Sequence, residues 1–155
     1  MSPLPKPSSR PPRIHLLRVE DGPEVFGELI AAARGLGLRV GWLDLAEPVP
    51  LPPDLETAAA AGALRAVAVG GGRSAAVKPL RGAAVLGDLL REHFRGCALV
   101  LIRGETAALL PAGAGEAVAR LARDGAAWRI EPPGAAAVPF TTADLAAALR
   151  RPRPW

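Results

Sequence analysis

The chain has 155 residues, of which 50% are hydrophobic, so it can bury the core of a single domain. Its formal charge of +4 comes from its ends, because all 15 acidic residues lie between Glu20 and Asp144, where they face 13 basic ones. This slightly acidic body has few aromatic residues and lacks the clustered Lys, Arg and stacking rings of a nucleic-acid groove, so we expect no nucleic-acid partner.

The first third of the chain predicts a tail followed by a strand, a helix and a second strand. Residues 1–13 are rich in proline, which predicts a disordered tail. Residues 14–19 form an apolar run that is typical of a buried strand. A helix is expected to begin at Pro23 and to end at Gly35, before a second strand at 38–45.

A short helix and a β-hairpin are predicted for the middle of the chain. A Pro-rich loop at 47–53 leads into a helix that Asp54 opens. Two strand-like segments, 66–69 and 74–78, follow and are joined by a glycine-rich turn. The glycines superficially match a phosphate loop, but a phosphate loop runs into a helix, whereas this segment stays strand-like and ends at Pro79. The pattern therefore favours a hairpin.

Helices and strands alternate in the predicted second half. Apolar positions at helical spacing predict a helix between Gly82 and Gly96, and residues 98–102 are typical of a fully buried parallel strand. We then expect a helix around 115–123, a strand at 128–131, a linker at 132–139 and a last helix from Ala143 to Arg150, capped by Thr141 or Thr142. This order predicts one three-layer α/β domain over 14–150, with a mostly parallel sheet and one β-hairpin, and a basic tail at 151–155.

The compartment is predicted from segments that the sequence lacks. The single Cys97 excludes an intramolecular disulfide framework. The first residues have no apolar stretch of the kind found in secretory signals, and the longest strongly apolar run, 97–102, is too short to span a bilayer. We therefore expect a cytoplasmic protein without membrane contact.

The entry to the first helix resembles a nucleotide-binding opening without its phosphate-binding residues. A phosphate loop needs glycines whose N–H groups surround the anion, a Lys for the outer phosphates and a hydroxyl for Mg²⁺. Residues 20–24 offer three carboxylates, no Lys, no hydroxyl, and a Pro that removes one donor. Each carboxylate close to a triphosphate costs on the order of 1–4 kcal/mol near a surface. We predict that polyphosphate does not bind here in the usual pose.

Three segments, in order and suitably spaced, carry a resemblance to a known family. Residues 14–40 combine a strand, a loop, and a helix that leads to Gly-Leu-Arg-Val. Residues 54–69 have an Asp-started helix, an Ala-Gly-Ala turn and the start of a hairpin, and residues 98–104 form a strand that ends in Ile-Arg-Gly. Together they resemble the MobB family, the small P-loop adaptors of molybdopterin-guanine dinucleotide synthesis. The resemblance implies a P-loop-NTPase-like fold and a dimer that binds partners.

The chain departs from the family at the nucleotide-binding positions. Asp21, Gly22 and Pro23 stand roughly where the family has Gly-Lys-Thr, and Arg103 replaces a Glu beside the metal and the attacking water. The basic turn expected after the second strand is replaced by 43–47, which carries two carboxylates. These losses predict a degenerate pseudo-NTPase that is not an enzyme, holds no cofactor, and acts as an accessory or adaptor subunit linked to a molybdenum or tungsten enzyme or to assembly of its cofactor. A homodimer through the hairpin, or a place in a larger complex, is implied by the resemblance.

Two other functions remain open. One is an active binder of GTP or a pterin-like cofactor, in which Arg18, Arg73 and Arg103 replace the lost Lys as anion contacts. The other is an unrelated Rossmann-like interaction domain with a structural role. At the end of the second strand, Asp44 and Glu47 are placed to pair with Arg18 or Arg103. At the end of the central strand, Arg103 and Glu105 either fill the abandoned pocket with an internal salt bridge or contact a ligand.

The remaining reactive and aromatic residues predict little chemistry. His15, His93 and Cys97 are not clustered in the sequence, so neither a metal site nor a Cys/His nucleophile is expected, and no catalytic residue is assigned. Trp155 beside Arg153 has the composition of an interface hot spot, which predicts a contact with a protein partner.

Overall fold

The computed structural model describes residues 13–45, 49–106, 109 and 118–155. The predicted disordered tail, apart from Arg13, lies outside these ranges, as do the start of the predicted 47–53 loop and the first residues of the helix expected at 115–123. Within them, no helix has the length and apolar character that a membrane crossing requires.

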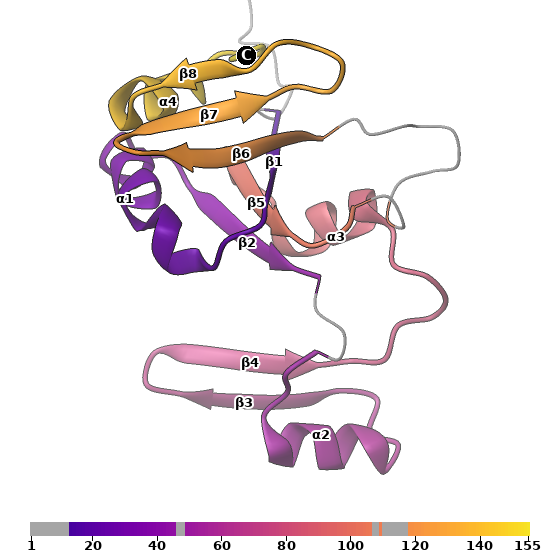
Figure 1. Cartoon of the computed structure of the whole chain (residues 1–155). Helices are drawn as coiled ribbons and strands as arrows, with labels where there is room; N and C mark the ends of the chain where they lie inside the picture. The colour runs from indigo at the N-terminus through magenta and orange to yellow at the C-terminus, as the bar shows by residue number, and fades with distance from the viewer. Residues whose placement is uncertain (1–12, 46–48, 107–108, 110–117) are drawn as a thin grey trace, which may run out of the picture.

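A six-stranded sheet forms the centre of the molecule (Figure 1). Its spatial order is β2 (Val40–Asp44), β5 (Leu99–Arg103), β1 (His15–Val19), β6 (Ala119–Asp124), β7 (Ala127–Glu131) and β8 (Val138–Phe140). The four strands from β2 to β6 pair in parallel, whereas β7 is antiparallel to both of its neighbours. This confirms the predicted α/β class and the mostly parallel sheet.

Helices cover the two faces of the sheet unequally. On one face, α1 (Gly27–Gly35) and α4 (Thr142–Ala148) bury a core that includes Leu17, Leu101 and Trp128. On the other face, α3 (Leu86–His93) covers Val100 and Ile102 of β5. Strand β5 is therefore buried on both sides, which explains its uninterrupted apolar run. Burying each such side chain contributes about 1.5–3 kcal/mol.

The helix ends follow local sequence signals. Pro23 opens a short 3-10 helix, η1 (Pro23–Phe26), which continues into α1, where Leu29 and Ala33 are buried as their spacing predicts. The side chain of Thr141 accepts a hydrogen bond of 3.1 Å from the backbone N–H of Asp144 and caps α4. Thr141 is thus the cap, of the two threonines considered.

The β-hairpin stands apart from the sheet, with one short helix packed on it (Figure 1). Strands β3 (Ala66–Gly70) and β4 (Arg73–Val77) pair only with each other, and α2 (Pro53–Ala60) covers one side of them. We call these elements the hairpin lobe. Gly71 and Gly72 both have left-handed φ angles, of 56° and 74°, as a two-residue hairpin turn requires. The predicted hairpin is therefore confirmed. Lys78, the residue after β4, forms an ion pair with Glu92 of α3, and this contact lowers the pKa of the Glu92 carboxyl.

The predicted helix at 115–123 is wrong where the structure describes it, because residues 119–124 form strand β6. Their burial alternates at first: Ala119 and Leu121 face the core, while Arg120 and Ala122 face the other side. Alanine and leucine favour a helix, but the segment pairs with β1 on one side and with β7 on the other, and this pairing decides its conformation. Strand β8, placed in the predicted linker, was also missed.

Candidate functional site

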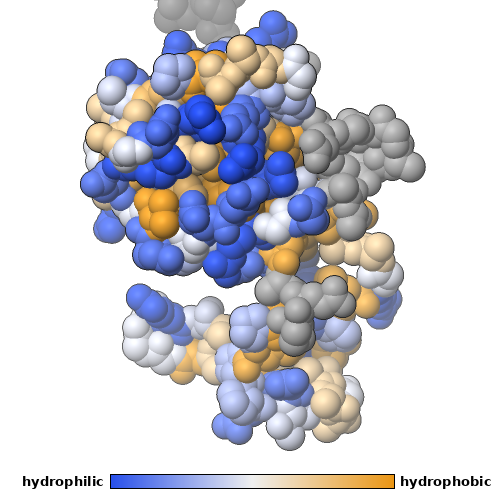
Figure 2. Space-filling model, viewed as in Figure 1, coloured by the Kyte–Doolittle hydropathy of each residue, from blue (hydrophilic) through white to orange (hydrophobic). Residues whose placement is uncertain are grey.

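Parallel α/β sheets bind ligands beyond the carboxyl ends of their strands. In this chain those ends are Val19 of β1, Asp44 of β2, Arg103 of β5 and Asp124 of β6. Three of these four end residues are charged, and Figure 2 shows hydrophilic residues gathered over β1, β6 and β7.

The connection between β1 and η1 is too short for a phosphate loop. Only Glu20, Asp21 and Gly22 separate the two elements. The whole G-x-x-x-x-G-K-[ST] pattern is longer than this connection. Gly22 is extended (φ −71°, ψ 167°), and the Glu24 carboxylate folds back so closely that a Cβ on Gly22 would collide with it. A carboxylate thus lies over the loop in which a nucleotide-binding protein would hold phosphate.

Arg103 and Asp44 form a salt bridge at the ends of β5 and β2. Nε of Arg103 donates to Oδ1 of Asp44 at 3.2 Å, and a terminal guanidinium nitrogen pairs with Oδ2. The hydrogen bond with Asp44 raises the pKa of Arg103. The guanidinium also lies 5.7 Å from the ring centroid of Trp42. Of the pairs predicted here, the one between Asp44 and Arg103 is present, and Glu47 lies outside the described residues.

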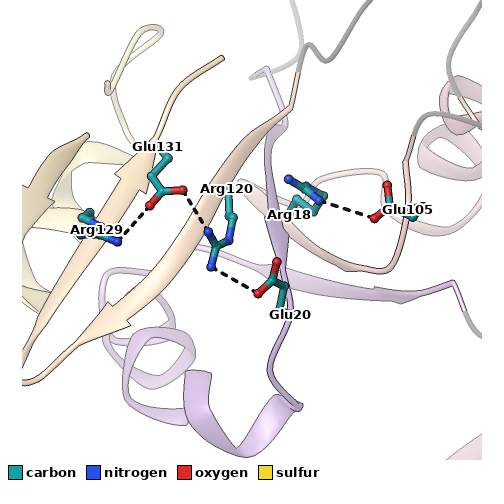
Figure 3. A network of polar contacts seen from close by, with 6 residues as sticks. All are labelled: Arg18, Glu20, Glu105, Arg120, Arg129 and Glu131. Carbon is teal, nitrogen blue, oxygen red and sulfur yellow. Dashed lines mark hydrogen bonds and ion pairs between the residues drawn. The ribbon is translucent and has the colours of Figure 1, made fainter. Parts of the chain in front are cut away.

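A second group of ion pairs spans β1, β6 and β7 (Figure 3). We call it the arginine–glutamate network; its members are Arg18, Glu20, Glu105, Arg120, Arg129 and Glu131. Arg120 is its centre and donates to Glu20 at 3.2 Å and to Glu131 at 3.1 Å. Glu131 also pairs with Arg129 at 3.1 Å, and Arg18 lies 3.8 Å from Glu105. Three positive and three negative side chains leave the network without net charge.

A further arginine on β6 pairs with the first helix. Arg123 binds Glu28 at 3.0 Å, donates to the Gly125 carbonyl at 2.8 Å and lies 4.4 Å from the ring centroid of Trp128. One nitrogen of Arg123 and Nε of Arg120 are buried without a hydrogen-bond partner. Sequence reasoning missed both arginines because it assigned 115–123 to a helix. The alternation of Arg120 with Ala119 and Leu121 favours a strand, but Val118, Leu121 and Ala122 fit a helical spacing equally well.

The three arginines considered as anion contacts do not share a site. Arg18 is in register with Ile102, and Arg103 with Val19, so strand alternation directs their side chains to opposite faces of the sheet. Arg73 lies beside the turn of the hairpin lobe.

The predicted partner-binding residues lie at the opposite edge of the sheet. Trp155 is half-buried against the main core, and its ring centroid lies 5.5 Å from that of His15. Nε2 of His15 donates to the Leu149 carbonyl at 3.1 Å, and burial lowers the pKa of this imidazole. The contact of Trp155 and Arg153 with a partner stays a prediction.

The described residues offer few groups for metal or nucleophile chemistry. Among them, no group of three or more His, Cys, Asp or Glu could hold a metal ion. Burial raises the pKa of the Cys97 thiol, which reduces its thiolate fraction at neutral pH.

At the carboxyl-end edge, the positive charges of the arginines are balanced by neighbouring carboxylates. A polyanion placed there would have to displace Asp44, Glu20 or Glu131 from their arginines, and would meet the carboxylate of Glu24 as well. Exposed ion pairs of this kind contribute about 0–1 kcal/mol each to stability, so their main effect is to neutralise the charge of the arginines.

No model of a known protein family matches the chain, and no curated protein is significantly similar to it.

Proposed function

We propose that this chain is a non-catalytic, MobB-like pseudo-NTPase that acts as an accessory or adaptor subunit through protein contacts. The observation that carries the proposal is the three-residue β1–η1 connection with the Glu24 carboxylate folded over Gly22. This geometry favours loss of nucleotide binding, because the connection is too short to surround a phosphate with N–H groups and contains no Lys.

The hairpin lobe supports action through protein contact. In its pairing register, Val67 lies opposite Ala76 and Val69 opposite Ser74, on the side away from buried Ala66. The two valines are 56% and 81% exposed. Exposed apolar faces of this kind mark interaction sites, and two strands are marginally stable alone. We therefore propose that a second copy of the chain packs on this face, as the family resemblance implies.

A molybdenum or tungsten enzyme, or a factor that assembles its cofactor, is the proposed client of this dimer. The resemblance alone supports this part of the proposal. Co-purification of the tagged chain with such an enzyme or factor from its native cells would support it. Recovery of the dimer with neither would favour a structural Rossmann-like domain instead.

Nucleotide titration tests the loss of binding. We expect calorimetry of the full chain with GTP and excess Mg²⁺ to give no saturable heat at concentrations up to about 1 mM, because the site is acidic and short of donors. An active P-loop GTPase in the same buffer serves as the control. Magnesium-dependent GTP binding in the micromolar range would overturn the pseudo-NTPase proposal.

Substitution in the hairpin lobe tests the dimer. We expect Val69→Glu to convert the wild-type dimer to a monomer in size-exclusion chromatography with light scattering, since it places charge in the apolar face. Val85→Glu is the matched control, because Val85 is 46% exposed but lies at the start of α3, outside the lobe. A monomeric wild-type chain, or a Val69→Glu variant as dimeric as wild type, would refute self-association through this face.

A further inference from the structure

The fold brings the two basic ends of the described chain together. Arg13 lies two residues before β1, and Arg153 lies five residues after α4. Both line one pocket beside the amino end of β1. The hydrogen bond from His15 to the Leu149 carbonyl joins these regions across 134 positions of sequence. Figure 1 shows the chain end marked C close to the start of β1. Positive charge that is split between two ends in the sequence is therefore gathered at one place.

A cavity of about 410 Å³ lies at this junction. We call it the terminal cavity; its wall includes Arg13, His15, Val118, Arg153 and Trp155, and none of the described residues that line it is Asp or Glu. Its volume is within the range of small-molecule sites.

The two arginines of the terminal cavity differ from those of the sheet. All five arginines of the six-stranded sheet form ion pairs: Arg18, Arg103, Arg120, Arg123 and Arg129. Across the described ranges, neither Arg13 nor Arg153 has a carboxylate within 4.0 Å. No described Asp or Glu side chain pairs with either of them, and a guanidinium group is suited to two parallel hydrogen bonds with phosphate or carboxylate.

His15 and Trp155 contribute two rings to the wall of the terminal cavity. His15 is 8% exposed, and burial lowers its pKa, so the imidazole is largely neutral at pH 7 and the positive charge comes from the arginines. Trp155 is half-buried and its ring is tilted by 59° against that of His15. It adds a flat apolar wall on which a planar ring can stack.

We propose that the terminal cavity binds a small planar oxyanion, an aromatic ring that carries a phosphate or carboxylate group. Arg13 and Arg153 hold the oxyanion, and Trp155 contacts the ring. This site lies at the amino ends of the strands and goes beyond the proposed adaptor function, since it depends neither on nucleotide loss nor on the hairpin lobe.

Calorimetry of the full chain with phenyl phosphate, benzoate, inorganic phosphate and phenol tests the proposal. We expect saturable binding of phenyl phosphate, or of benzoate if the site prefers carboxylate. Inorganic phosphate and phenol should each bind about tenfold more weakly or worse, because each lacks one half of the recognised group. The double variant Arg13→Gln, Arg153→Gln should weaken binding of the aromatic anion by about tenfold or more, whereas Trp155→Phe should retain it.

The matched control changes charge without touching the terminal cavity. Arg34 and Arg39 are exposed and lie at the end of α1 and just before β2, so Arg34→Gln, Arg39→Gln removes the same charge and should bind as wild type. Circular dichroism checks that each variant folds. An equal loss of affinity in both double variants would mean that only the net charge of the protein matters, and would refute the site. Equal affinity for inorganic phosphate would refute the role of Trp155, and no saturable binding of either aromatic anion would refute the proposal entirely.

Discussion

At the residue scale, His15 shows how one buried polar side chain joins distant segments. Its ring lies within strand β1, its Nε2 donates to the Leu149 carbonyl just after α4, and it contacts the Trp155 ring. Such a hydrogen bond contributes about 0.5–1.5 kcal/mol net, and its loss leaves a buried carbonyl unsatisfied. The segment after α4 is thereby held to the sheet, although its composition predicts a tail.

The lowered pKa of His15 predicts a dependence of stability on pH. Burial places the folded-state value below the unfolded value of 6.5, so the unfolded chain binds the proton first as pH falls. The free energy of unfolding should therefore decrease as pH is lowered from 7.5 through 6.5 to about 5.5. Urea denaturation of wild type and His15→Gln at both ends of this range measures it. The variant should be less stable at pH 7.5 but lose less on acidification, and parallel curves for the two proteins would contradict the assignment.

At the element scale, most of the fold is predictable because the apolar residues of most segments recur with the period of either a strand or a helix. The apolar runs of β1 and β5, the stripe on α1 and the glycine turn between β3 and β4 each have a single physical interpretation. The sequence of strand β6 has two interpretations, because Val118, Leu121 and Ala122 also fit a helical spacing. The ion pairs of Arg120 depend on β6 and were not predicted, whereas the Asp44–Arg103 pair was one of the alternatives that the adjacent strand ends offered.

Two glycines in regular elements predict opposite effects of added side-chain volume. Gly27 begins α1 with helical angles and open space around it, so Gly27→Ala should stabilise the chain by about 0.5–1 kcal/mol. Gly41 in β2 has the Phe94 ring against it, so a Cβ there would overlap the ring. Gly41→Ala should destabilise by about 1–3 kcal/mol. Thermal unfolding of both variants beside wild type compares them, and a stabilised Gly41→Ala would mean that Phe94 can move aside at little cost.

At the scale of the whole molecule, charge and apolar surface are segregated. Ion pairs balance the charges of the carboxyl-end edge, Arg13 and Arg153 lie at the amino-end edge, and the hairpin lobe exposes valine. This arrangement supports the proposal that the chain contacts its partners through the hairpin lobe.

Self-association through the hairpin lobe predicts a concentration-dependent unfolding temperature. Because only the folded chain dimerises, mass action should raise the melting temperature of wild type as protein concentration increases. Differential scanning fluorimetry across about two decades of concentration measures this. The Val69→Glu variant should show no such dependence, while Val85→Glu should follow wild type. A melting temperature of wild type that does not change with concentration would count against the dimer.

Pro139 gives the sheet one protected margin. It is the middle residue of β8, the short strand at one end of the sheet, and lies in register with Arg129. Proline has no N–H to donate, so this margin cannot offer an incoming strand the full row of donors and acceptors that strand addition requires. Uncontrolled stacking of chains into fibrils is disfavoured there, and the opposite margin, β2, is the one along which a seventh strand could be added.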